Sequence, residues 1–231
     1  YSNPVIETGV CWMSGTGADG DWYALGDDVV GYKVDLCVNI YATDRNFVSV
    51  WNGFTWDNGI PDASFSAIID GDYTSVGDIE CHNLTINSGQ SLSVSVNTGF
   101  RVNGSFLNNG AVNILSDETG IGSLITNGPV NNNGTFNMQR YVQKNAWHYI
   151  SSPVMDLTAS LFNGDYLQYW QESDTTWYEI ITSSFPLQTG VGYALWTDEN
   201  KTYTFSGVPK SGKQETLLTF TNTTAAEDGH E

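Results

Sequence analysis

The segments FRVNGSFLNNGAVNI (residues 100–114) and LITNGPVNNNGTFNM (residues 124–138) align without a gap at an offset of 24 residues. Six of the fifteen aligned positions are identical, and all six are Asn or Gly. Four further positions pair apolar residues: Phe100 with Leu124, Phe106 with Val130, Val112 with Phe136, and Ile114 with Met138. A period in the twenties, combined with short strands of alternating polarity, predicts a stacked β-solenoid.

Asn-Gly pairs separate these short strands, at residues 103–104, 109–110, 127–128 and 133–134. Asn and Gly tolerate positive φ, which tight corners often require. Stacked turns would place Asn103 over Asn127 and Asn109 over Asn133, where the side-chain amides can pair. The alternative is an antiparallel meander, because Asn-Gly is also the strongest hairpin signal. Of the two, the repeat favours the solenoid.

The pattern extends beyond the repeat and predicts a solenoid of three to four turns within residues 51–140. Residues 117–120 interrupt it and indicate an insertion at a corner. Near its start, Trp51 and Trp56 flank an Asn-Gly pair, which fits either an aromatic platform for sugar or a cap on the open end. We favour the cap, because a solenoid must cover its exposed edges.

The flanking regions differ from the repeat. Residues 1–50 contain two candidate strands, at residues 9–13 and 32–42, and this segment resembles part of a fibronectin type III-like module. Residues 141–231 are rich in aromatic residues, and strand candidates separated by polar turns predict an antiparallel β-sandwich-like domain that lacks its last strands. The expected fold class is therefore all-β: a short solenoid followed by a sandwich-like domain.

The charge balance excludes several classes of partner. The chain has 26 acidic and 8 basic residues, for a net charge of −18, with no basic patch. Nucleic acid and anionic lipid are therefore not expected partners. No apolar run is long enough to span a membrane. Only 15% of the residues are charged, and a polar surface built from Asn, Thr, Ser and Gly suits an extracellular protein.

Three cysteines and several acidic turns are candidates for stabilising cross-links. Cys11 and Cys37 lie in one candidate β region and would form a disulfide if the protein is exported, which leaves Cys81 as a small buried residue. Two Asp-Gly-Asp turns, Asp19 with Asp21 and Asp70 with Asp72, offer the hard oxygen ligands that calcium prefers. Neither turn matches an EF-hand, and the alternative is that both are simply solvated.

Aromatic residues gather in the last third of the chain and define the candidate ligand-binding site. The site consists of Tyr169, Trp170, Trp177, Tyr178 and Trp196. Aromatic faces stack on sugar rings, and the neighbouring acidic and amide side chains would hold the hydroxyls. The alternative is that these rings alternate into a core.

An enzyme is the less favoured interpretation. A hydrolase needs two opposed carboxylates, for which Asp70, Asp72, Asp78 and Glu80 are candidates by number alone. A lyase that acts on acidic polysaccharide needs Arg or Lys side chains to stabilise negative charge in the transition state. The solenoid region offers only Arg101, Arg140 and Lys144. No nucleophile motif accompanies His82 or His148. We therefore expect no catalytic residues.

Several segments together carry a resemblance to a known module. They include Trp51-Asn-Gly, Gly59-Ile-Pro-Asp62, Trp147-His-Tyr-Ile-Ser-Ser-Pro153 and Gly190-Val-Gly-Tyr193. Across residues 50–220 the chain resembles a recurrent module of large secreted or cell-surface proteins of Bacteroidetes, many of them exported by the type IX route. The resemblance implies a secreted or outer-surface location and a place beside other domains of a longer chain. It also implies adhesion or carbohydrate binding, with a structural stalk or spacer as the alternative.

Overall fold

The computed structural model describes residues 12–14, 22–24 and 47–211, and the chain divides into two compact units, residues 1–45 and 46–231. In the first unit, β1 (Trp12–Ser14) and β2 (Trp22–Ala24) form an antiparallel pair. In the described part of the second unit, the only helices are two short 3-10 turns, η1 (Ala159–Phe162) and η2 (Glu172–Asp174). The chain is therefore all-β.

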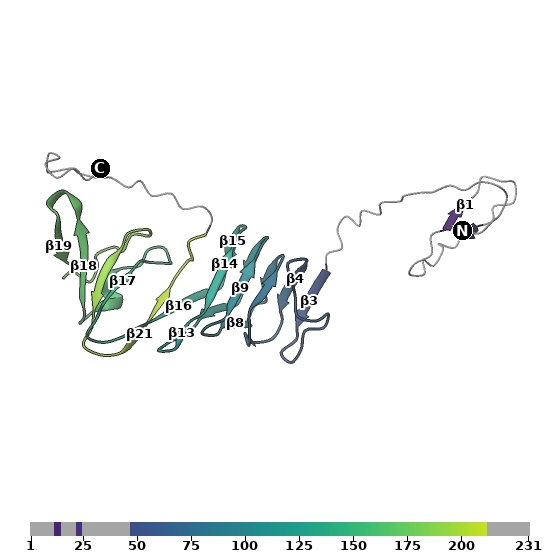
Figure 1. Ribbon diagram of the computed structural model, residues 1–231, viewed down its shortest axis with the longest axis horizontal. Coiled ribbons are helices and arrows are strands. Elements are labelled where there is room, and N and C mark those ends of the chain that lie inside the picture. Colours follow the sequence, from purple (N-terminus) through teal and green to yellow (C-terminus); the bar gives the residue numbers. More distant parts are fainter. Residues whose placement is uncertain (1–11, 15–21, 25–46, 212–231) are drawn as a thin grey trace, which may run out of the picture. The chain divides into compact units, whose positions relative to one another are not determined.

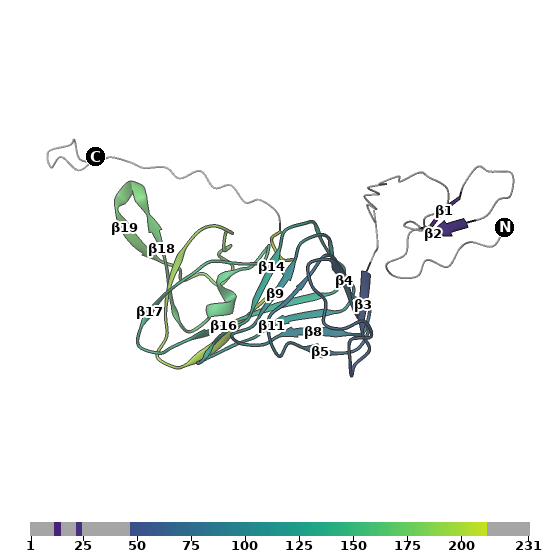
Figure 2. The ribbon, with the colours of Figure 1, turned by 45° about the vertical axis from the view of Figure 1, so that its right-hand side comes forward.

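A β-solenoid of about four turns begins at Phe47, and three parallel sheets run along its stack (Figures 1 and 2). The first sheet contains β3 (Phe47–Trp51), β4 (Phe65–Ile69), β7 (Leu84–Ile86), β10 (Phe106–Asn108) and β15 (Val130–Asn132). The second contains the parallel strands β5 (Tyr73–Thr74), β8 (Ser91–Val94), β11 (Ala111–Ile114) and β16 (Thr135–Val142), and β21 (Lys201–Ser206) is added to its end in the antiparallel direction. The third contains β6 (Ile79–Cys81), β9 (Gly99–Val102) and β14 (Ser123–Thr126). A hairpin of β12 (Ser116–Asp117) and β13 (Gly120–Ile121) is inserted at one corner.

The register of the stack reproduces the alignment of the repeat. Phe106 pairs with Val130, Val112 with Phe136, Ile114 with Met138, and Phe100 with Leu124, all between parallel strands. Parallel pairing excludes the hairpin meander, because consecutive strands of a meander run antiparallel. The two residues of each aligned pair therefore occupy equivalent positions in successive turns.

Asparagine side chains connect the turns. Asn127 donates a hydrogen bond from its amide to Asn103 at 3.1 Å, and Asn133 donates to Asn109 at 2.9 Å, as the sequence predicted. Two further ladders were not predicted: Asn137 donates to Asn113 at 3.0 Å, and Asn108 donates to Asn132 at 2.6 Å. Asn108 is fully buried, so its ladder holds the interior of the stack rather than its surface.

The corner glycines serve a different purpose from the one expected. None of Gly104, Gly110, Gly128 and Gly134 has a positive φ. Instead, a Cβ atom on Gly128 or Gly134 would collide with the backbone carbonyl of Gly104 or Gly110 in the preceding turn. The expectation of left-handed corners was therefore wrong at these positions, because close contact between backbones, rather than dihedral freedom, demands glycine.

The first turn is closed by the loop that follows β3. The amide of Val50 donates to Asp57 at 2.7 Å, and the side chain of Asn58 donates to the carbonyl of Val48 at 2.7 Å. These contacts satisfy polar groups on the outer edge of β3, which would otherwise be free to pair with another chain. Trp56 is buried in the same loop and its ring lies 5.7 Å from Trp51, so both tryptophans belong to this cap.

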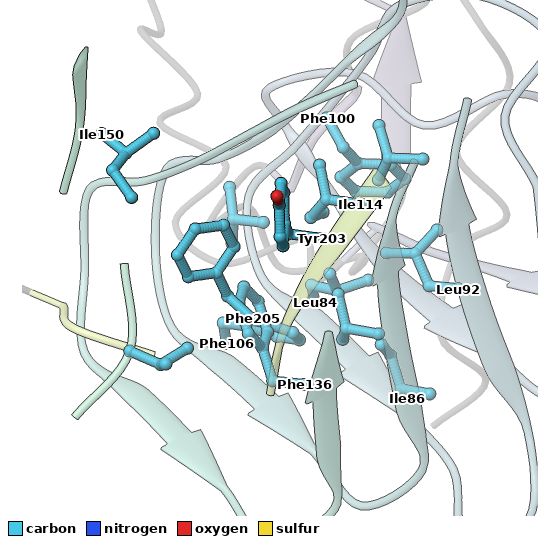
Figure 3. Close-up of a cluster of buried hydrophobic side chains, with 14 of the residues drawn as sticks. Leu84, Ile86, Leu92, Phe100, Phe106, Ile114, Phe136, Ile150, Tyr203 and Phe205 are labelled. Atoms are coloured by element: carbon cyan, nitrogen blue, oxygen red, sulfur yellow. The ribbon is translucent and has the colours of Figure 1, made fainter. Parts of the chain in front are cut away.

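At the other end, β16 extends past the stack and pairs antiparallel with β21 (Lys201–Ser206). A four-stranded antiparallel sheet follows, in the order β17 (Trp147–Ile150), β20 (Tyr193–Trp196), β18 (Tyr166–Gln171) and β19 (Thr176–Glu179). Buried residues of this sheet join those of the solenoid in one hydrophobic cluster, which includes Phe106, Ile150 and Phe205 (Figure 3). Residues 212–231, the last part of the region expected to form the sandwich-like domain, lie outside the described residues.

Candidate functional site

The outer face of the four-stranded sheet carries six aromatic side chains. Residues that pair across neighbouring strands, and residues two apart along one strand, share a face. Trp147, Trp196 and Tyr166 form one row across β17, β20 and β18, and Trp170 and Trp177 form another across β18 and β19. Tyr149 stands two residues after Trp147 on the same face. We call this set the aromatic face: Trp147, Tyr149, Tyr166, Trp170, Trp177 and Trp196.

The rings of the aromatic face are accessible to solvent. Five of the six are largely exposed: Trp147 52%, Tyr149 74%, Tyr166 55%, Trp170 45% and Trp177 40%. Trp196 is half-buried, and its ring lies 5.4 Å from that of Tyr166 in an edge-to-face arrangement. Trp170 and Trp177 adopt the same arrangement at 5.4 Å. Such contacts hold the rings in fixed positions while their outer faces stay open.

Polar groups lie between the rings. Gln168 pairs with Glu179 across β18 and β19, and both share the aromatic face because they alternate with Leu167 and Tyr178. Gln168 stands midway between Tyr166 and Trp170 along β18. An amide can donate and accept hydrogen bonds, whereas a carboxylate accepts them. The face therefore combines ring surfaces with groups that can hold hydroxyls.

The structure separates the five aromatic residues that the sequence grouped together. Trp170, Trp177 and Trp196 lie on the aromatic face, but Tyr169 and Tyr178 lie on the opposite face of the sheet. Tyr169 stacks between Tyr178 and Phe185, with centroid distances of 5.7 Å to each. Tyr178 also donates a hydrogen bond to Asp174 at 2.8 Å, which raises the pKa of the Tyr178 hydroxyl. These two tyrosines contribute to packing of the hairpin.

Three members of the face were missed by the sequence analysis: Trp147, Tyr149 and Tyr166. The signal was present in two stretches, Trp147-His-Tyr149 and Tyr166-Leu-Gln-Tyr-Trp170, where aromatic residues recur at even spacing. Even spacing along a strand places side chains on one face. Only the strand order β17-β20-β18-β19 shows that the two stretches belong to one surface.

A partly buried charged network anchors the sheet to β21. Asp165, whose side chain is 2% exposed, accepts hydrogen bonds from Lys201 at 2.6 Å and from Tyr203 at 2.7 Å. Burial alone would raise the pKa of Asp165, but the bonds from Lys201 and Tyr203 outweigh it and lower that pKa. Burial and the bond to Asp165 raise the pKa of Tyr203. The network therefore holds the start of β18 in place.

The predicted calcium ligands have other roles where they are described. Asp70 accepts a hydrogen bond from Asn87 at 2.7 Å, and Asp72 accepts two from Ser91, at 2.9 and 2.8 Å. Both contacts join neighbouring turns. Asp19, Asp21, Cys11 and Cys37 lie outside the described residues, within which no group of three or more His, Cys, Asp or Glu is arranged to hold a metal ion. Cys81 is a free, buried thiol whose pKa burial raises to about 12.

The carboxylates considered for hydrolysis are likewise part of the stack. Asp78 accepts a hydrogen bond from the Gly99 amide at 2.7 Å, and Glu80 accepts one from Asn103 at 2.8 Å. A cavity of about 220 Å³ adjoins β16 and β17, and Arg140, Ile150 and Phe205 are among its lining residues.

In the parts of the chain that the structure describes, no helix has the length and apolar character needed to cross a membrane.

Comparison of the chain with protein-family models, with curated proteins and with solved structures gave no match.

Proposed function

We propose that this chain is a non-catalytic carbohydrate-binding module of a cell-surface or secreted protein. Its role there is adhesion. The observation that carries the proposal is the aromatic face: six rings on one side of one sheet, five of them at least 40% exposed. Monomeric proteins rarely leave a contiguous apolar patch of this kind open unless it binds something.

Carbohydrate fits this face better than a purely apolar ligand. Gln168 and Glu179 stand among the rings and can form hydrogen bonds with hydroxyls. A sugar ring presents an apolar C–H surface that stacks on an aromatic face, while its rim carries the hydroxyls. A lipid or apolar peptide would instead leave Glu179 without a partner, at a cost in desolvation.

The test is binding to a broad glycan array, followed by titration calorimetry with each glycan that binds. Trp177→Ala is expected to weaken binding at least tenfold, because truncating a tryptophan anchor commonly costs about 2 kcal/mol or more. Tyr178→Ala is the matched control, since Tyr178 is the next residue on β19, is equally exposed at 41%, and lies on the opposite face. Phe54→Ala, in the cap loop, controls for the loss of an exposed aromatic elsewhere.

Each variant must be shown to fold, by circular dichroism and thermal unfolding, before its binding is compared. Equal loss of binding in Trp177→Ala and Tyr178→Ala would contradict the proposal, because a real site distinguishes the two faces. Absence of binding to every glycan by the folded protein would also contradict it.

A structural role as a spacer is the second candidate, favoured by the closure of the solenoid. The cap loop satisfies the edge of β3, and residues of the antiparallel sheet join the core of the stack in one cluster. A stack closed in this way is a stiff element that can separate neighbouring domains of a longer chain. The spacer predicts that the Trp177→Ala protein is indistinguishable from wild type in every binding assay.

A further inference from the structure

The aromatic face consists of two platforms. The first is the row Trp147, Trp196 and Tyr166, which are paired side by side across β17, β20 and β18. The second consists of Trp170, Trp177 and Tyr149, joined by ring contacts of 5.4 Å and 6.3 Å. Gln168 and the small Ala194 lie in the same cross-strand row as Tyr149, between the first platform on one side and Trp170 and Trp177 on the other.

The separation of the platforms sets the size of ligand that can use both. Tyr166 and Trp170 are four residues apart on β18, which corresponds to about 14 Å at roughly 3.4 Å per residue. One sugar unit advances a chain by roughly 5 Å, because the chain crosses a six-membered ring and a linking oxygen, all joined by single bonds of about 1.5 Å. A sugar stacked on Tyr166 is therefore separated from a sugar stacked on Trp170 by one or two intervening units.

The charge on the face selects the class of glycan. Glu179 is the only charged side chain among the residues that the register places on this face, and none of them is Lys, Arg or His. The chain as a whole carries a net charge of −18. A polymer of uronic acids would meet repulsion from both, whereas a neutral chain would not.

We infer that the aromatic face binds a neutral oligosaccharide of at least three to four units, with one sugar stacked on each platform and Gln168 holding a hydroxyl between them. This inference rests on the proposed function and adds the length and charge of the ligand. Binding at two linked platforms makes the second contact intramolecular, so affinity increases steeply once the chain is long enough to reach both.

The test uses soluble oligosaccharide series of two to six units, made of β-1,4-linked glucose, xylose, mannose and N-acetylglucosamine, with oligogalacturonates as the anionic series. Calorimetry is expected to show at least a tenfold gain in affinity between two and four units of a neutral series, and little gain beyond five. The oligogalacturonates are expected to bind at least tenfold more weakly than neutral chains of equal length.

Trp147→Ala and Trp177→Ala remove one exposed ring from each platform, both on edge strands. Each is expected to reduce the affinity for the tetrasaccharide at least tenfold and to flatten its dependence on chain length, while Tyr178→Ala leaves that dependence intact. A disaccharide that binds as tightly as the tetrasaccharide would overturn the two-platform arrangement but leave the proposed function standing. Tighter binding of oligogalacturonates would overturn the charge preference, and failure of every series to bind would overturn both proposals.

Discussion

Tyr149 and Trp177 lie on the two opposite edge strands of the four-stranded sheet, yet their ring centroids are only 6.3 Å apart. Two strands separate them, and on this face the register places Ala194 and Gln168 between them. The rings therefore lean toward each other across the sheet. Ala194 is 4% exposed even though it points to the outer face, which indicates that the rings cover it.

Ala194→Leu is expected to separate these two rings. A larger side chain beneath them should lower the free energy of unfolding by about 1–3 kcal/mol, the usual effect of overpacking. It should also weaken the glycan binding that we propose, because the second platform loses its geometry. Urea unfolding measures the first effect and calorimetry the second. A stable variant with unchanged affinity would show that the rings do not depend on the small residue.

Gly134→Ala is expected to destabilise the solenoid by about 1–3 kcal/mol, the usual cost of overpacking, even though alanine is intrinsically favoured over glycine in regular structure by roughly 0.5–1 kcal/mol. The added Cβ would collide with the carbonyl of Gly110 in the preceding turn. Gly77→Ala is the matched control, because nothing lies within 4 Å of its added Cβ and its φ is not positive. Equal stabilities of the two variants in chemical unfolding would contradict the backbone-contact explanation.

The buried asparagine ladder should matter more than the exposed ladders. Asn108→Ala removes three hydrogen bonds and leaves the Gly110 amide, the Asn132 side-chain oxygen and the Thr135 carbonyl without those partners. We expect a loss of about 2–4 kcal/mol, because each buried polar group left unpaired costs about 1–3 kcal/mol. Asn133→Ala, in an exposed ladder, should cost less than about 1 kcal/mol. Similar losses in both variants, measured by denaturant titration, would show that burial does not decide the strength of a ladder.

Asp165 should make stability depend on acid pH. Its pKa is lowered from the ordinary 3.8 by hydrogen bonds from Lys201 and Tyr203, which outweigh the opposing effect of burial. The stabilisation is complete above pH 3.8, begins to fall there as the unfolded chain takes up the proton, and is lost once pH drops through the lower folded value. Asp165→Asn should therefore be less stable at pH 7 by about 1–3 kcal/mol and show a shallower decline in acid.

Thermal unfolding from pH 7 to pH 2.5 follows this decline, and Asp174→Asn provides the control. Asp174 also has a lowered pKa, owing to bonds from Ser173 and Tyr178, but it lies exposed on the hairpin. If stability declines with falling pH in the same way in wild type and in Asp165→Asn, the pH dependence comes from other carboxylates.

The solenoid was predictable from sequence because successive turns present the same environment at the same position. Asn103 and Asn127 are identical since each must pair its amide along the stack, and Gly110 and Gly134 are identical since each must admit a neighbouring backbone. Identity at a fixed offset therefore encodes register directly. The φ of those corners is not encoded in this way, which is why the reason for glycine was misassigned.

The aromatic face was only partly predictable. Alternation along β18 and β19 assigns Trp170 and Trp177 to one side and Tyr169 and Tyr178 to the other, so that division was available from the sequence. Pairing between distant segments was not: Tyr149 meets Trp177 only because β20 and β18 lie between their strands, in an order that differs from the order in the chain. No local pattern specifies that order.

The stacked turns also mean that the length of the solenoid can change only in fixed steps of one turn. Because each turn contacts only its neighbours, a duplicated copy of residues 103–126 would insert in register, with its asparagines and glycines continuing the existing columns. One such duplication moves the aromatic face about 4.8 Å further from the cap loop, the spacing of neighbouring strands, without altering either end. Recombination of this gene segment would thus adjust the distance between the aromatic face and the cap loop in equal steps, independently of the ligand that we propose for that face.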